Sequence, residues 1–361
     1  MTDRSSGDAG AFQFTGTWRD YAPIAFTNLL LTIVTLGVYS FWARARTRRF
    51  LWSRTRFIDD RLEWTGTGLE LFIGYVIAFF VVLLPLGIVN LVLQGVLMRG
   101  HQGAAGLMTL IVYALVLYFV GVARFRALRY RLSRTRWHGI RGGSDVQGFA
   151  YGWSYFWRTI VSFATVYLMT PWAMTTLWNE RWNAMSFGSL AFRSEARWQP
   201  VFKRFLLFYL VPIVLFLGVG ILAFLFLKSR GEATVGPPAF AAVAAAVTIF
   251  YVLFFGVLGV IAMAFYAAFF REAIGATSLG ALDFGFGAST KDWIKLFLGN
   301  AALVVLTLGI GFIFVPYRNW AFFVRHLEAY GEVAVDTLAQ SATREPGQGE
   351  GLLDAFDVGA F

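Results

Sequence analysis

Polar side chains recur at a fixed spacing inside apolar stretches of the chain. Asn28, Thr32 and Thr35 fall on one face of the helix predicted there, and Asn300 and Thr307 repeat the seven-residue spacing between Asn28 and Thr35. In a bilayer, such side chains either hydrogen-bond neighbouring helices together or line a site for a solute where two broken helices meet. The sequence is compatible with both roles, so these five residues are candidates for an intramembrane polar site.

Two further polar residues, Asn90 and Gln94, lie four apart in another apolar stretch and are additional candidates to line such a site. Ionisable residues deep in apolar stretches indicate proton or ion coupling, and these stretches contain none. Arg158, near the start of one stretch, is expected to extend to the lipid headgroups. This pattern weighs against a proton-coupled pump and leaves a passive pathway, or no pathway.

Arginine is concentrated in two segments, residues 44–61 and 124–141. Near a membrane surface each arginine contributes about 1 kcal/mol of attraction to anionic lipids. Equally, these residues would mark a cytoplasmic face and form salt bridges with Asp59, Asp60 and Glu63. We expect the lipid bilayer as a partner, with its anionic headgroups bound by these arginines. The candidates are Arg44, Arg46, Arg48, Arg49, Arg54, Arg56, Arg129, Arg131, Arg134 and Arg136.

The chain offers little for catalysis. Its three histidines, His101, His138 and His326, lie in separate segments without metal-ligand spacing, and it has no cysteine. The sequence contains no glycine-rich phosphate loop, serine nucleophile elbow or His-Glu-x-x-His motif. We therefore expect no enzyme, cofactor or metal site, with lipid chemistry by scattered residues as the enzymatic alternative.

Composition places the chain in a membrane. Of 361 residues 58% are apolar and 14% charged, whereas soluble domains are about half apolar and about a quarter charged. The net charge of +10 is explained by Lys and Arg in cytoplasmic loops, so nucleic acid is not an expected partner. The first residues lack the pattern of a cleaved signal peptide.

Seven uncharged stretches are about long enough to cross a hydrocarbon core of roughly 30 Å. The second and third are joined by a short loop, as are the fifth and sixth. The stretches are 21–43, 71–98, 104–123, 159–179, 205–227, 239–270 and 296–317.

Glycine-rich or polar turns between aromatic residues predict four short β-hairpins at one membrane face, at 56–64, 137–152, 185–192 and 279–287. The acidic residues of 331–361 predict a disordered tail, and residues 1–11 are expected to be disordered too.

An internal repeat emerges when the chain is aligned with itself at an offset of 272 residues. Eight identities occur where chance gives one or two. They join Phe12, Phe14, Asp20, Asn28, Leu31, Thr35, Leu36 and Gly37 to Phe284, Phe286, Asp292, Asn300, Leu303, Thr307, Leu308 and Gly309. With a weaker middle copy, this predicts one repeat-built membrane domain, residues 12–330, with copies near 12–66, 137–196 and 279–330.

Several motifs resemble the YjgN-type bacterial inner-membrane proteins, a family of unknown function. They are Phe14-Thr15-Gly16, Asn28-Leu29-Leu30-Leu31-Thr32, Thr35-Leu36-Gly37-Val38-Tyr39, Trp42-Ala43 and Arg54-Thr55. The resemblance covers roughly residues 12–330 and implies an inner-membrane location without implying an activity. One departure is Phe41, where the family pattern places proline; Pro171-Trp172 keeps that pair in the middle copy.

Charge counting separates two topologies. If the first, fourth and seventh stretches turn back at Thr-Leu-Gly and Thr-Pro breaks, all but three of the 31 Lys and Arg residues share one side. Seven full crossings would instead place about 20 of them on one side and about 11 on the other. The positive-inside rule therefore favours four crossings and three re-entrant segments, with the hairpins and the C-terminal tail cytoplasmic. The predicted fold is mainly α, a polytopic helical membrane protein with internal repeats. Its predicted role is transport or channel-like; the alternative is a non-conducting scaffold that binds lipid headgroups.

Overall fold

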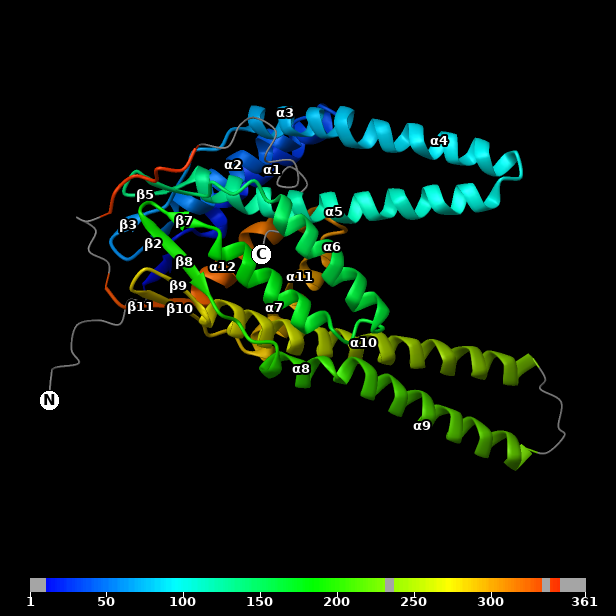
Figure 1. The fold of residues 1–361 in the computed structure, drawn as a ribbon. Coiled ribbons are helices and arrows are strands. Elements are labelled where there is room, and N and C mark those ends of the chain that lie inside the picture. Colours follow the sequence, from blue (N-terminus) through cyan, green and yellow to red (C-terminus); the bar gives the residue numbers. More distant parts are fainter. Residues whose placement is uncertain (1–10, 231–236, 333–337, 345–361) are drawn as a thin grey trace, which may run out of the picture.

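The computed structural model describes residues 11–230, 237–332 and 338–344. Helices form most of the molecule, short strands gather at one end, and two long helix pairs extend from that end (Figure 1). The predicted class, a mainly α-helical membrane protein with short antiparallel strands, is confirmed.

Four helical segments in the described part of the chain are long and apolar enough to cross a membrane. They coincide with the second, third, fifth and sixth predicted stretches. Their outer surfaces are exposed and apolar, as at Leu110 and Val252, which is the surface that lipid chains cover. The segments are α3–η1–α4 (Gly68–Ala78, Phe79–Leu83, Leu84–Met98), α5 (Gln102–Arg134), α8–α9 (Gln199–Phe205, Leu207–Arg230) and α10 (Pro237–Gly275).

The other three predicted stretches each form two helices joined by a tight turn. The pairs are α1 (Trp18–Val34) with α2 (Ser40–Ser53), α6 (Phe149–Ala164) with α7 (Thr170–Asn183), and α11 (Thr290–Leu306) with η2 (Ile310–Phe314) and α12 (Val315–His326). The α6–α7 pair ends well short of the far ends of the long helices (Figure 1). None of these stretches is therefore a single continuous helix.

One threonine organises each of the three turns. The hydroxyl groups of Thr35, Thr165 and Thr307 each donate to the carbonyl oxygen four residues earlier, at 2.6 to 2.9 Å. Each also accepts the backbone N–H four residues later. The hydroxyl therefore gives a partner to a backbone N–H that the break would leave unpaired.

The two residues after each of these threonines have positive φ, which ends the first helix and reverses the chain. The Thr-Leu-Gly breaks lie where the sequence predicts them, and Gly37 and Gly309 adopt this conformation without steric cost. The predicted Thr-Pro break is displaced. In the middle hairpin the turn is formed by residues 165–169, and Thr170-Pro171 begins α7, because proline suits the first turn of a helix.

The strands form one layer beside the helices. Eight strands pair in the order β11-β10-β9-β8-β7-β6-β5-β4. Strands β1, β2 and β3 pair in a second sheet, and β3 is followed directly in the chain by β4 of the first. The first sheet comprises β4 (Glu63–Trp64), β5 (Thr135–Trp137), β6 (Ile140–Gly143), β7 (Ser186–Phe187), β8 (Leu190–Ser194), β9 (Thr277–Leu279), β10 (Leu282–Phe286) and β11 (Leu327–Tyr330). The second comprises β1 (Phe12–Phe14), β2 (Thr55–Phe57) and β3 (Asp60–Arg61).

All four predicted β-hairpins occur, with one correction. The sequence predicts that the second hairpin runs to residue 152, but its strands end at Gly143 and residues 149–152 begin α6. Gly148, with φ of 85°, redirects the chain into that helix. Aromatic residues there pack along a helix rather than a strand.

Tryptophans of the returning helices join the hairpins to the strands. Trp52, Trp178 and Trp320 each donate an indole N–H to a threonine hydroxyl at the first residue of a strand, at 2.8 to 3.2 Å. The acceptors are Thr135, Thr277 and Thr55, respectively. These bonds join distant parts of the chain and fix where each of the three helical hairpins meets the strand layer.

Part of the C-terminal tail contacts the sheet. Gln340 accepts the backbone N–H of Arg141 at 3.0 Å and donates to the carbonyl of Gly139 at 3.1 Å. Ser341 is buried. Contacts with the sheet thus extend into the tail over residues 338–344, where its composition predicts disorder. The expected disorder of residues 1–10, 333–337 and 345–361 lies outside the described residues.

Candidate functional site

A cavity of about 540 Å³ lies where the first and third helical hairpins meet, with α5 on its third side. Asn28 and Thr32 of α1, both predicted site residues, line it. Asn319 of α12 and Thr47 of α2 add further polar groups, and Trp320 contributes an aromatic wall. Its volume is in the range of small-ligand sites, and its lining combines apolar walls with a few polar groups.

Asn28 presents an unused acceptor at this cavity. Its Nδ2 donates to the carbonyl of Ala43 at 3.2 Å and to Thr47 Oγ1 at 3.3 Å. Asn28 is only 7% exposed, and its buried Oδ1 has no hydrogen-bond partner among the described residues. Because a buried, unpaired carbonyl is unfavourable, this atom is suited to a donor on a bound molecule.

Three arginines make the cavity positive. Arg44 and Arg48 of α2 and Arg131 of α5, all predicted headgroup candidates, line it. None of the described residues that line it is acidic. Arg48 is buried, with its guanidinium 5.1 Å from the ring centre of Trp64. The structure therefore brings two separately predicted sets, intramembrane polar residues and arginines, to one place.

The counterpart of Asn28 in the third hairpin is occupied by its own neighbours. Asn300 Nδ2 donates to Asn319 Oδ1 at 2.9 Å, and Arg318 Nε donates to Asn300 Oδ1 at 2.6 Å. Asn300 does not line the cavity, whereas its partner Asn319 does. Sequence reasoning missed Thr47 and Asn319, yet the 272-residue offset that pairs Asn28 with Asn300 also pairs these two.

Four predicted polar residues besides Asn300 do not line the cavity. Thr35 and Thr307 stabilise the hairpin turns. Asn90 and Gln94 are exposed on the outer half of α4, where Gln94 Nε2 donates to Asn90 Oδ1 at 2.9 Å. Neither residue lines this cavity, so their role in a polar site stays a prediction.

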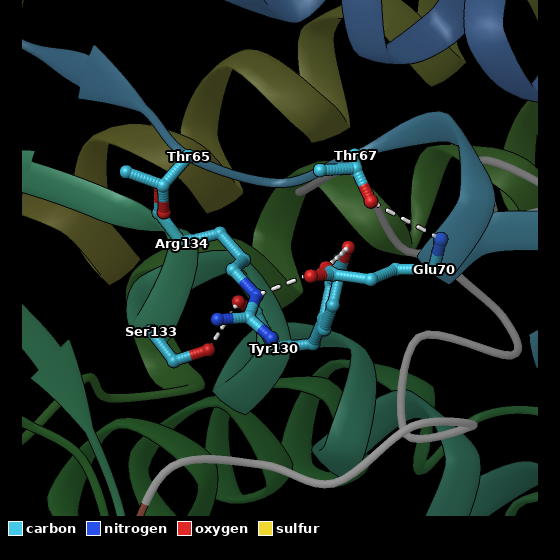
Figure 2. Close-up of polar contacts among 6 residues, drawn as sticks. All are labelled: Thr65, Thr67, Glu70, Tyr130, Ser133 and Arg134. Atoms are coloured by element: carbon cyan, nitrogen blue, oxygen red, sulfur yellow. Dashed lines mark hydrogen bonds and ion pairs between the residues drawn. The ribbon is translucent and has the colours of Figure 1, made fainter.

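Other headgroup candidates have structural contacts. Arg134 Nε lies 3.1 Å from Glu70 Oε2, which also accepts the hydroxyl of Tyr130 at 3.0 Å (Figure 2). The backbone N–H of Glu70 donates to Thr67 Oγ1, and Thr65 Oγ1 donates to the carbonyl of Arg134 (Figure 2). This cluster fastens the start of α3 to the end of α5.

The remaining headgroup candidates point elsewhere. Arg129 is almost fully buried and donates to the carbonyl of Val146 at 3.0 Å. Arg136 lies in β5, opposite Arg141 of β6. The guanidinium of Arg54 lies over the ring of Phe50. Three candidates are exposed away from the cavity, namely Arg46, Arg49 and Arg56.

The first hairpin turn of the strand layer contacts a histidine. His138 Nε2 lies 2.9 Å from Asp59 Oδ1, and its Nδ1 lies 3.7 Å from Asp60 Oδ2. The hydrogen bond with His138 lowers the pKa of the Asp59 carboxyl. These two aspartates, predicted to pair with arginines, contact a histidine of the neighbouring hairpin.

A family model described as "Bacterial protein of unknown function (DUF898)" matches residues 9–355. The chain belongs to this family. Proteins named "Inner membrane protein YjgN" are similar to it: that of Salmonella typhimurium is 23% identical over 156 residues and that of Escherichia coli K12 25% over 154. These segments cover 43% and 42% of this chain but only 36% and 35% of the relatives' own length. The resemblance inferred from the motifs is confirmed, and no solved structure matches the chain.

Proposed function

We propose that the protein binds the phosphate-bearing headgroup of an anionic lipid in the cavity between its first and third hairpins, in the bacterial inner membrane. The observation that carries this proposal is the lining itself. Arg44, Arg48 and Arg131 bring three positive charges to the lining, and guanidinium groups bind phosphate well. Asn28 Oδ1 adds an acceptor for a headgroup hydroxyl or amine.

The apolar hairpin tips support a position of the cavity at the depth of the headgroups. The hairpin turns end in apolar side chains, and Leu36 and Leu308 are each 94% exposed to the surroundings of the protein. We infer that the three hairpins are copies of one repeat and that their tips enter the hydrocarbon as re-entrant segments. The strand layer and the C-terminal tail then lie on the cytoplasmic side. The names of the relatives support the inner membrane as the location.

Passage of a solute is the second candidate function. It is favoured by one observation, the position of the cavity between two broken hairpins, which is where transporters with discontinuous helices place their sites. Conduction requires water to reach Asn28, and it predicts that Asn28→Leu abolishes solute flux in liposomes. A headgroup site predicts that the same variant leaves liposome permeability unchanged.

The re-entrant arrangement predicts the labelling of single cysteines, which are clean reporters because the chain has none of its own. We expect Leu36→Cys to resist a membrane-impermeant maleimide both in intact cells and in inverted vesicles, and to react after detergent solubilisation. Its side chain is exposed in the protein, so only lipid can protect it. Gln102→Cys should react in intact cells and Ser189→Cys only in inverted vesicles. Labelling of Leu36→Cys in intact cells would show that α1 crosses.

Headgroup binding is tested by lipid-dependent stability. In nanodiscs, phosphatidylglycerol should raise the wild-type thermal midpoint by about 5 °C over phosphatidylcholine, as a ligand at about a hundredfold above its Kd would. We expect Arg48→Met to lose about half of this shift. Asn28→Asp should lose nearly all of it, because the new carboxylate neutralises the arginines in place of the lipid.

The matched control is Arg46→Met, which removes the same charge from an exposed position of the same helix and should keep the shift. If Arg46→Met and Arg48→Met lose it equally, the attraction is a general surface effect and the proposed site is wrong.

A further inference from the structure

A second cavity, of about 380 Å³, is formed by residues of both helices of the third hairpin. Its lining includes four basic side chains and one acidic side chain. The basic residues are Lys295 of α11 and Arg318, Arg325 and His326 of α12, and the acid is Asp292 of α11. Because α11 begins shortly after β10 and α12 ends directly before β11, the cavity lies toward the strand layer and away from the apolar tip of the hairpin.

The acid of this cavity already has a role in the fold. Asp292 Oδ2 accepts the backbone N–H of Ser289 at 3.0 Å and its hydroxyl at 2.6 Å, which caps the start of α11. His326 Nε2 lies 4.0 Å from the same oxygen. Asp20 forms the same cap with Thr17 at the start of α1, so this carboxylate belongs to the helix start in both hairpins.

The cations of the cavity have fewer contacts. Lys295 and Arg325 are exposed and form no hydrogen bond or ion pair with any residue that the structure describes. Arg318 Nε donates to Asn300 Oδ1 at 2.6 Å, and its two terminal nitrogens have no hydrogen-bond partner among the described residues. Three permanent positive charges therefore line the cavity, against one carboxylate that is engaged in a helix cap.

The two exposed cations are not needed to build such a hairpin. At the 272-residue offset, Lys295 and Arg325 correspond to Pro23 and Ser53 of the first hairpin, which forms with uncharged residues at both positions. Positive charges that line a cleft raise the local concentration of anions. A basic lining that the fold does not require is therefore suited to bind an anion.

We propose that Lys295, Arg318 and Arg325 form a second anion site, which binds a phosphate group in this cavity. The guanidinium groups offer paired N–H donors that match phosphate oxygens, and the lysine adds a point charge. The phosphate belongs either to a soluble anion or to a lipid headgroup. This site shares no lining residue with the first cavity, so it does not depend on the proposed function.

The soluble source is tested in phosphatidylcholine nanodiscs by adding inorganic phosphate, with sodium chloride of equal ionic strength as the reference. We expect phosphate to raise the wild-type thermal midpoint by about 3 °C, as a ligand at about ten times its Kd would. Lys295→Met and Arg325→Met should each lose about half of this gain or more, because each removes one of the three charges. Both side chains are exposed, so neither variant should unfold the chain.

The matched control is Lys291→Met, because Lys291 is exposed on the same helix and does not line the cavity. It should keep the full gain. Lys295→Arg retains the charge and should keep most of the gain. Equal losses in Lys291→Met and Lys295→Met would show a general surface attraction, and the proposed site would be wrong.

The lipid source is tested in Asn28→Asp, the variant expected to remove the response of the first cavity. A gain from phosphatidylglycerol that persists in Asn28→Asp, and disappears when Lys295→Met is added, identifies a lipid headgroup as the ligand. If neither inorganic phosphate nor phosphatidylglycerol gives a gain that depends on Lys295 and Arg325, this inference is overturned, whatever Arg48→Met shows for the first cavity.

Discussion

Replacing Gly121 by valine is expected to destabilise the protein by about 3 kcal/mol or more. Gly121 of α5 and Gly152 of α6 allow the two helices to approach at backbone distance. A Cβ atom at Gly121 would lie 2.6 Å from Tyr155 Cβ and 2.9 Å from Gly152 Cα. Backbone atoms cannot rotate away as a flexible side chain can, so α6 must shift along its whole contact with α5.

Gly106→Val is the matched control, because Gly106 lies in the same helix and a Cβ there meets nothing within 4 Å. We expect it to change stability by less than about 0.5 kcal/mol. Thermal midpoints of both variants in one detergent, with membrane-embedded yield as a second readout, measure the difference. Equal losses would mean that valine itself, rather than the close helix crossing, is responsible.

Local features of this fold could be predicted well from sequence. Runs of uncharged residues identify the four long helices, because a bilayer imposes their length and composition. Thr-Leu-Gly predicts the reversal at Gly37, since glycine tolerates positive φ. The middle hairpin shows the limit: Tyr167 adopts φ of 65° where the other two hairpins have glycine, so no residue type there indicates the turn.

The candidate site could be predicted only in part. Asn28 stands out because an amide inside an apolar stretch is conspicuous. The arginines of α2 are distributed around its circumference, so their spacing cannot tell which ones face inward. Tertiary packing, including the contact of Arg48 with the ring of Trp64, leaves Arg48 buried and Arg46 exposed. Other contacts of this region, such as that of Tyr21 with the carbonyl of Ile313, join residues nearly 300 positions apart and leave no local pattern.

The strand layer shows the same limit. Each hairpin has a recognisable turn, but the pairing of β8 with β9 depends on helices that return the chain after more than 80 residues. Single-sequence periodicity carries no information on that pairing. The order of the eight-stranded sheet follows from where the helical hairpins place the strands.

A large loss of stability is also expected when Trp320 is replaced, because Trp320 joins the last helical hairpin to the first. Its indole stacks on Trp52 with ring centres 4.0 Å apart, and its N–H donates to Thr55 Oγ1 at 2.8 Å. We expect Trp320→Ala to cost about 3 kcal/mol, since it removes a large aromatic contact and leaves a void beside the cavity. Trp320→Phe keeps the stacking and should cost only about 1 kcal/mol for the lost hydrogen bond.

Trp153→Ala is the control, because that side chain is 60% exposed on α6 and its removal should change stability by less than about 0.5 kcal/mol. Trp320→Ala should also lose the stabilisation by phosphatidylglycerol, since the cavity is bounded by the two hairpins that Trp320 holds together. Thermal midpoints in the two lipid compositions report both effects. If Trp320→Ala were as mild as Trp153→Ala, the first and third hairpins would be held together elsewhere, and a cavity between them could not depend on this contact.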